Sequence, residues 1–280
     1  MVFFAQIIIW VNVLMNAFGR FFLAPIAVLP GWLSNTIISA VTGLFLLVIF
    51  KYTSNQRAIG KIRDDIKAHM LALKLFRDSI SVTLHAEVRI FKGAFLLLFH
   101  AIPPMLVMIL PVSLLLAQMS LWYQSRPLLP GELAVMTVKL NDNVEGNWPT
   151  VNVEPTSAAE VTVGPVRVLS KGEICWEIKA LENGKHHITL NVNRHQIEKD
   201  LAIGDGFMRV SSTRPALNWA SILMNPAEKP FAPDSIVQSV TIDYPDRLSK
   251  TSGADWWLIY FFIASMVFAF ISRPFLKVRI

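Results

Sequence analysis

The sequence has a single cysteine, few charges and none of the short motifs that mark common enzyme active sites. Of its 280 residues, 16% are charged, whereas a soluble globular domain carries about a quarter. Cys175 stands alone, so no disulfide can form within the chain and no cysteine pair can bind a metal. GxSxG, P-loop, HExxH and GxGxxG motifs are missing. We therefore expect a protein that is not an enzyme, with no catalytic residues, no cofactor and no metal site.

The charges that are present are unevenly distributed. The segment Lys51–Lys92 has nine basic and four acidic residues, and the tail adds Arg273, Lys277 and Arg279. Residues 123–255, in contrast, have thirteen basic and sixteen acidic residues. Because the positive charge lies beside apolar runs, membrane topology explains the pI of about 9.5 better than nucleic acid does. We expect no DNA partner.

Three uncharged apolar runs are long enough to cross a bilayer, which takes about 20 helical residues. They lie in the predicted spans 32–50, 94–122 and 255–272, and the second contains Pro103, Pro104 and Pro111. Cytoplasmic loops collect Lys and Arg. The segment 51–93 and the tail 273–280 are therefore predicted to be cytoplasmic, and residues 123–254 extracytoplasmic, in a multi-pass protein of the plasma (inner) membrane.

Residues 1–31 are predicted to be an interfacial helix and its lead-in. Gln6, Asn12, Asn16 and Arg20 fall on one side of a helical wheel, and apolar residues occupy most of the rest. A signal peptide is one alternative, although the start has no Lys or Arg and no Ala-x-Ala site. A fourth span is the other.

The basic segment 51–93 is predicted to be a coiled-coil-like helical hairpin. Apolar residues recur every three or four positions from Ile59, and Ser54 or Asn55 can cap the helix start. A single straight helix would end roughly 55–60 Å from the membrane. The β-branched run Ser79–Thr83 is therefore the expected break, with a second arm over 84–91. Two roles stay open for this hairpin. It is either a solvated linker without a partner or a surface that contacts a client, a ribosome or lipid through its basic residues, namely Arg57, Lys61, Arg63 and Lys67.

The extracytoplasmic segment changes to a period of two, which predicts an all-β, immunoglobulin-like sandwich inserted between the last two spans. The turn Glu182–Lys185 predicts a β-hairpin. Cys175, between Ile174 and Trp176, is expected in the core. Five strands are predicted, at 133–140, 160–169, 173–181, 187–192 and 236–244.

Polar residues also lie inside the spans. Asn35, Ser39 and Thr42 form one stripe on the first span, and His100 and Gln118 share a face on the second. Such residues either pack helices together or line a polar groove. We name these five as candidate groove-lining residues and leave both interpretations open.

The order of elements around Lys51-Tyr52-Thr53-Ser54-Asn55-Gln56 resembles that of the YidC/Oxa/Alb superfamily, most closely its short three-span members. Pro25 and Pro30 before the first span and the proline-interrupted second span add to this resemblance, which covers about Phe21–Tyr123. It implies a cytoplasm-facing hydrophilic groove, and an insertase-like chaperone acting in protein transport, with membrane lipids and nascent or client membrane proteins as partners.

The chain departs from the family pattern in two ways. No Lys or Arg lies within the three spans, and about 130 residues separate the last two spans. The alternative function is therefore a membrane-anchored binding or scaffold protein. It would act through its β-sandwich on an envelope protein partner. A subunit of a larger membrane complex is a further alternative.

Overall fold

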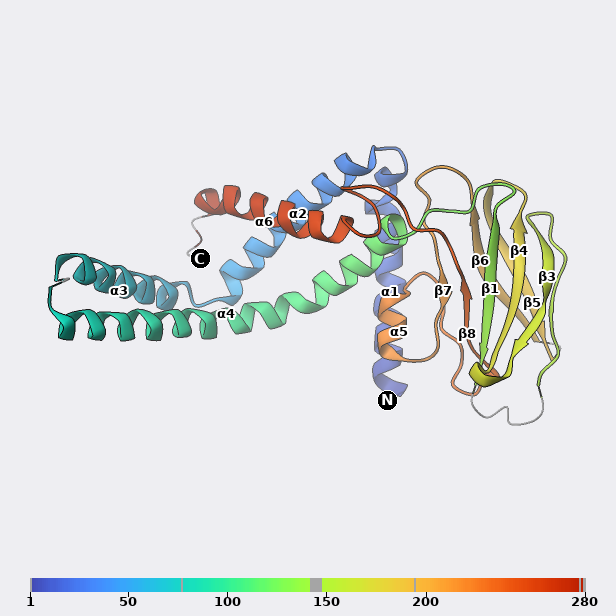
Figure 1. Ribbon diagram of the computed structural model, residues 1–280, viewed down its shortest axis with the longest axis horizontal. Helices are drawn as coiled ribbons and strands as arrows, with labels where there is room; N and C mark the ends of the chain where they lie inside the picture. Colours follow the sequence, from blue (N-terminus) through green and yellow to red (C-terminus); the bar gives the residue numbers. More distant parts are fainter. Residues whose placement is uncertain (1, 77, 142–147, 194, 277, 279–280) are drawn as a thin grey trace. The chain divides into compact units, whose positions relative to one another are not determined.

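The computed structural model describes residues 2–76, 78–141, 148–193, 195–276 and 278 (Figure 1). The chain divides into two units. We call Met1–Asn35 with Ser113–Tyr260 the β-domain unit, and Thr36–Val112 with Phe261–Ile280 the helical unit.

Three helices are long and apolar enough to cross a membrane among the described residues. They are α2 (Gly31–Thr53), α4 (Ile80–Tyr123) and α6 (Trp257–Leu276), and each contributes residues to both units. The predicted runs 32–50 and 94–122 lie within α2 and α4, and most of 255–272 lies within α6. The structure is thus consistent with a multi-pass membrane protein that carries a β domain.

The helix α4 is longer than predicted. It has 44 residues and includes three prolines, so it is about 65 Å long, twice the hydrocarbon thickness. Its start at Ile80 shows that the predicted second arm and the predicted span form one continuous helix. A change from charged to apolar residues does not interrupt backbone hydrogen bonding, so composition alone placed a boundary where none exists.

In the helical unit, α3 (Gln56–Leu75) and the first turns of α4 come close together. Asn55 caps α3 by accepting a hydrogen bond from the Ala58 amide at 3.0 Å, as expected. A Cβ atom on Gly93 would lie 2.5 Å from Ile66 Cγ1. The break between α3 and α4 lies before Ile80, whereas it was predicted at 79–83.

The helices α2 and α6 also cross closely in this unit. A Cβ atom on Gly43 would lie 2.2 Å from the backbone oxygen of Ser265, which no side chain tolerates. Small residues allow membrane helices to approach in this way.

The β domain contains two antiparallel sheets with one shared hydrophobic core. The five-stranded sheet has the order β3-β4-β1-β8-β7, and the three-stranded sheet the order β2-β5-β6. Met136 and Trp176 from the first sheet and Leu190 from the second are buried in this core. The bounds are β1 Leu133–Leu140, β2 Val151–Val153, β3 Ala159–Val168, β4 Glu173–Ala180, β5 Gly184–Val192, β6 His195–Ile203, β7 Thr213–Arg214 and β8 Val237–Ile242.

Two predictions in this domain are wrong. The turn before Gly184 does not make a hairpin, because β4 and β5 belong to different sheets and β5 pairs with β6. Cys175 lies outside the buried core and is half-buried, because side chains alternate along β4 and its neighbours Ile174 and Trp176 take the buried face.

The ends of the three apolar helices meet in the β-domain unit. Ser34 Oγ lies 2.8 Å from the Tyr123 hydroxyl. The Tyr123 ring stacks on Trp257 at 6.0 Å between centroids, and Trp257 Nε1 donates to Gln124 Oε1 at 3.1 Å. These polar contacts tie α2, α4 and α6 together beside the sheets.

The helix α1 (Val2–Phe22) continues into a short 3-10 helix, η1 (Ala24–Ala27), and packs beside α5 (Trp219–Met224). Its polar residue Asn12 is buried and donates to the Ile222 oxygen at 2.7 Å. Apolar residues such as Phe18 and Phe21 are exposed instead. Over residues 10–22, α1 thus turns polar residues to the protein and apolar residues outward, the reverse of a surface helix in a soluble protein.

Candidate functional site

Asn35, the first candidate groove residue, is fully buried in the β-domain unit. Its side-chain amide donates to the Thr251 oxygen at 2.6 Å and to the Trp257 oxygen at 3.2 Å. The side chain therefore joins the start of α2 to the start of α6, and its surroundings are protein.

Ser39 and Thr42 lie in the helical unit and are also buried, with 0% and 6% of their surface exposed. Ser39 is one helical turn before Gly43, the residue that contacts Ser265 on α6. This part of the stripe lies where α2 is covered by protein, which matches the packing interpretation of intramembrane polar residues.

His100 has a different environment, a hollow of about 330 Å³ in the helical unit. Thr53 and Asn55 line this hollow at the end of α2, and Phe99, Ile102 and Pro103 line it from α4. One ring nitrogen of His100, Nδ1, lies 2.7 Å from the Leu96 oxygen. Pro103 and Pro104 lack amide hydrogens and so deprive the carbonyls of Phe99 and His100 of their helical donors. The polar side chains that line the hollow are those of His100, Thr53 and Asn55, and the rest of its wall is apolar.

Gln118 belongs to a polar cluster between α4, α1 and the loop before β7, and it is 3% exposed. Its Nε2 donates to Asn16 Oδ1 at 3.0 Å. Arg209 donates from Nη2 to Gln118 Oε1 at 3.1 Å and also to Asn16 Oδ1. Burial, and next the positive charge of Arg20, lower the pKa of Arg209 to about 10. The hydrogen bonds of this guanidinium thus go to neutral amide oxygens, while the charge of Asp200 partly opposes the lowering of its pKa.

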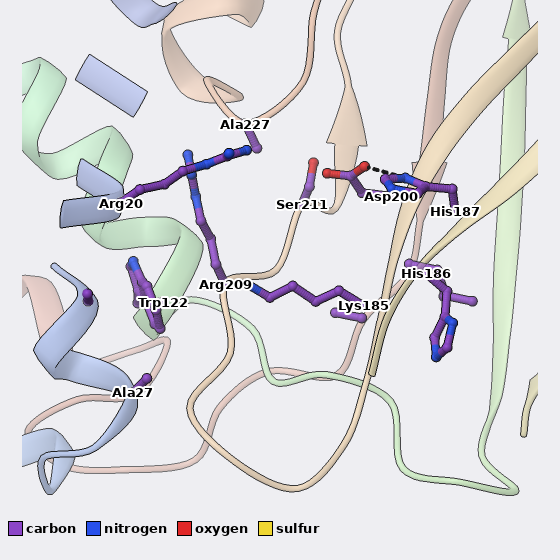
Figure 2. A pocket seen from close by; sticks show the side chains of 13 residues that line it. Arg20, Ala27, Trp122, Lys185, His186, His187, Asp200, Arg209, Ser211 and Ala227 are labelled. Atoms are coloured by element: carbon purple, nitrogen blue, oxygen red, sulfur yellow. Dashed lines mark ion pairs between the residues drawn. The ribbon is translucent and has the colours of Figure 1, made fainter. Parts of the chain in front are cut away.

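A cavity of about 480 Å³ adjoins this cluster within the β-domain unit (Figure 2). Arg20, Lys185 and Arg209 contribute to its wall, as do His187 and Asp200. Figure 2 shows the Lys185 side chain directed toward Arg209, and Arg20 near the end of Arg209. Asp200 pairs with His187 Nδ1 at 2.9 Å.

The positive groups around this cavity outnumber the negative ones. Neither Arg20, Lys185 nor Arg209 forms an ion pair with any residue that the structure describes. His186, although it lines the cavity, places Nε2 at 3.0 Å from the Glu182 oxygen. The cavity is therefore a candidate anion site.

A buried ion pair lies next to the cavity. Lys199 Nζ donates to Glu228 Oε1 at 2.6 Å and to the Ser211 oxygen at 2.6 Å. The Lys199 side chain is 0% exposed and that of Glu228 is 8% exposed. Burial lowers the pKa of Lys199, and the charge of Glu228 opposes this shift. The pair fixes the loop that contains Ser211 and Arg209 against β6.

The predicted basic contact residues lie on α3 of the helical unit. Arg57, Lys61 and Lys67 are exposed, and Arg63 is half-buried. They form no ion pair with any described residue. Their charges are available to a partner.

The residues that sequence reasoning missed are Arg209, Lys199 and Glu228. Arg209 is 193 positions from Asn16, so no spacing rule links them. One weak indication of Lys199 as a special residue was available in the sequence, because a lysine in the middle of an otherwise alternating stretch is unusual. Among the described residues there is no group of three His, Cys, Asp or Glu residues that could hold a metal ion.

Comparison with protein-family models, with curated proteins and with solved structures finds no match to this chain.

Proposed function

We propose that this protein is an insertase-like chaperone of the plasma membrane that assists the insertion or assembly of client membrane proteins. It would work without covalent chemistry, and it would resemble the YidC/Oxa/Alb superfamily in mechanism. In this proposal α3 and the first turns of α4 form a cytoplasmic hairpin. The β domain is an extracytoplasmic, immunoglobulin-like module.

The observation that carries this proposal is the hollow around His100, where three polar side chains lie in a largely apolar wall. It lies where α2 ends at Thr53, beside two consecutive prolines of α4. An unsatisfied polar group in hydrocarbon costs several kcal/mol. A hollow that offers the His100 ring and the side chains of Thr53 and Asn55 would lower that cost for a polar client segment as it enters the bilayer.

The neighbouring helices support the same function. Phe95 and Phe99 on α4 are each 71% exposed, so an apolar client helix would find an uncovered face beside the hollow. The basic residues of α3 are proposed to lie in the cytoplasm, as the positive-inside rule requires. There they would contact a client, a ribosome or anionic lipid.

Only one of the five candidate groove residues named from sequence is therefore kept in the proposed client-contact site. We assign His100 to client contact. We assign Asn35, Ser39 and Thr42 to helix packing, because their side chains are buried in protein. Gln118 is assigned to the cluster around Arg209.

The proposal is tested by photo-crosslinking during membrane-protein synthesis. A crosslinker in place of His100 should form adducts with a nascent single-span client. The same crosslinker in place of Met105, an exposed α4 residue on another helix face, serves as the control and should yield mainly lipid adducts. Adducts from position 100 only to lipid or to this chain itself would contradict the proposal.

A second test uses proteoliposomes. Reconstituted protein should raise the fraction of a single-span client that becomes protected from protease, and His100→Leu should lower that gain severalfold. Met105→Ala should leave it unchanged. No gain over empty liposomes would contradict the proposed activity.

A second candidate function is an anchored binding module that acts through the β domain on an envelope partner. The charged cavity of the β-domain unit favours it. If this function is correct, substitutions around that cavity will abolish activity in cells, whereas His100→Leu will not.

A further inference from the structure

The residues that line the cavity between α1, η1 and the β domain carry more positive than negative charge. Asp200 is the single carboxylate among the described residues that line it, and it is already paired with His187. Arg20, Lys185 and Arg209 form no ion pair with any described residue, although the Asp200 carboxylate offsets part of the charge of Arg209.

Arg209 is the most constrained of these cations. Its Nη2 donates to two neutral amide oxygens, while its Nε is buried and has no acceptor among the described residues. A buried charge without an ionic partner is costly. An anion in the adjoining cavity would offset that cost, and guanidinium groups with a lysine are the usual recognition set for phosphate.

The surroundings of the cavity indicate where such an anion would come from. Ala24, Ala27 and Trp122 form an apolar part of its wall. Next to them Phe21, Phe22 and Val28 are 77%, 66% and 87% exposed. Aromatic and apolar side chains exposed along an amphipathic helix are typical of contact with the acyl region below the headgroups.

We propose that this cavity binds the phosphate group of an anionic phospholipid headgroup. Arg20, Lys185 and Arg209 hold the phosphate. The acyl chains stay outside the cavity, against Phe21 and Phe22. A volume of about 480 Å³ accommodates a headgroup and glycerol but not two acyl chains. The site would fasten α1 and the β domain to the membrane surface, whether or not the protein inserts clients.

The test uses the full-length protein in a neutral detergent and calorimetric titration with three probes. These are short-chain phosphatidylglycerol, short-chain phosphatidylcholine and inorganic phosphate. Phosphatidylglycerol should bind saturably, about tenfold more tightly than either of the others, because it combines a net negative charge with an apolar anchor.

Two exposed cations provide variants that should still fold. Lys185→Gln and Arg20→Gln should each weaken phosphatidylglycerol binding about tenfold, since each removes a charge-assisted contact. Lys171→Gln, an exposed lysine of the same domain away from the cavity, is the matched control and should bind like the parent. Lys185→Arg should retain most of the affinity. Circular dichroism of each variant checks that the sheets are intact.

Three results would overturn the proposal. One is equal affinity for phosphatidylglycerol and phosphatidylcholine. Another is an unchanged affinity in both Lys185→Gln and Arg20→Gln. The third is inorganic phosphate binding as tightly as the lipid, which would show that the cavity takes free phosphate.

Discussion

Lys199 is a fully buried charge in the middle of β6, and its position depends on one carboxylate. Glu228 accepts from Nζ at 2.6 Å, and the Ser211 hydroxyl also bonds that carboxylate. Replacing buried ion pairs by apolar residues is often neutral, whereas removing one partner leaves an uncompensated charge. The ion pair therefore couples the stability of β6 to that of the loop before β7.

Because of this coupling, substitutions at Lys199 and Glu228 should have non-additive effects on the free energy of unfolding. Glu228→Gln should lower the free energy of unfolding by about 3 kcal/mol because it leaves Lys199 buried without a counter-charge. The double variant Lys199→Met with Glu228→Gln should lose less than the sum of the single losses. Denaturant unfolding of the four proteins measures this, and strictly additive losses would show that the pair is not coupled.

The contact between Glu132 and Arg126 should make the stability of the β domain depend on pH. Arg126 donates two hydrogen bonds to its carboxylate at 2.7 and 2.8 Å, and these contacts hold the pKa of Glu132 below its ordinary value of 4.5. A carboxyl whose pKa is lowered in the folded state contributes stability that is complete above pH 4.5 and is lost as pH falls through the folded pKa.

The expected loss on acidification is about 1 kcal/mol, because the pair is partly exposed to solvent. Glu132→Gln should remove this part of the pH dependence while lowering stability at neutral pH. Thermal unfolding between pH 3 and pH 7 tests it. The same acid loss in parent and variant would assign the effect to other groups.

Several individual residues were beyond the reach of sequence reasoning. The polar face of α1 was recognised from Asn12 and Asn16, but their partners Ile222, Pro226 and Arg209 are about 200 positions away. Only the fold brings them together. The candidate anion site was missed for the same reason, since its cations come from α1, β5 and a loop.

At the scale of elements, periodicity predicted strands well and their pairing poorly. β1 matches the predicted range 133–140, because its buried and exposed residues alternate along its length. β6 was missed because buried Lys199 breaks the polar–apolar alternation, and β2 and β7 are too short to show a period. Local turn chemistry cannot reveal that β5 joins another sheet.

The α2–α6 crossing predicts the effect of one small substitution. By helix propensity alone, Gly43→Ala should stabilise α2 by about 1 kcal/mol. It should nevertheless destabilise the protein, because a Cβ atom would lie 2.2 Å from the Ser265 oxygen. We expect a net loss of about 1–3 kcal/mol. Thermal unfolding in detergent measures it, with Val41→Ala at an exposed position as control. A stabilised Gly43→Ala protein would mean that the two helices do not cross at this residue.

For the whole molecule, the apolar runs and the change of periodicity predicted the main organisation. The three apolar runs correspond to α2, α4 and α6, and the change to a period of two marks the β domain. The predicted orientation remains a proposal, since it depends on the positions of Lys and Arg relative to a bilayer. It implies that the basic α3 and the β domain lie on opposite sides of the membrane.

Labelling with a membrane-impermeant maleimide tests this central claim most directly. In a Cys175→Ser background, which removes the single cysteine, Lys171→Cys places a thiol in the β domain and Lys61→Cys places one on α3. Intact cells should label the first variant only, and permeabilised cells should label both. Labelling of both variants in intact cells, or of Lys61→Cys alone, would contradict the account.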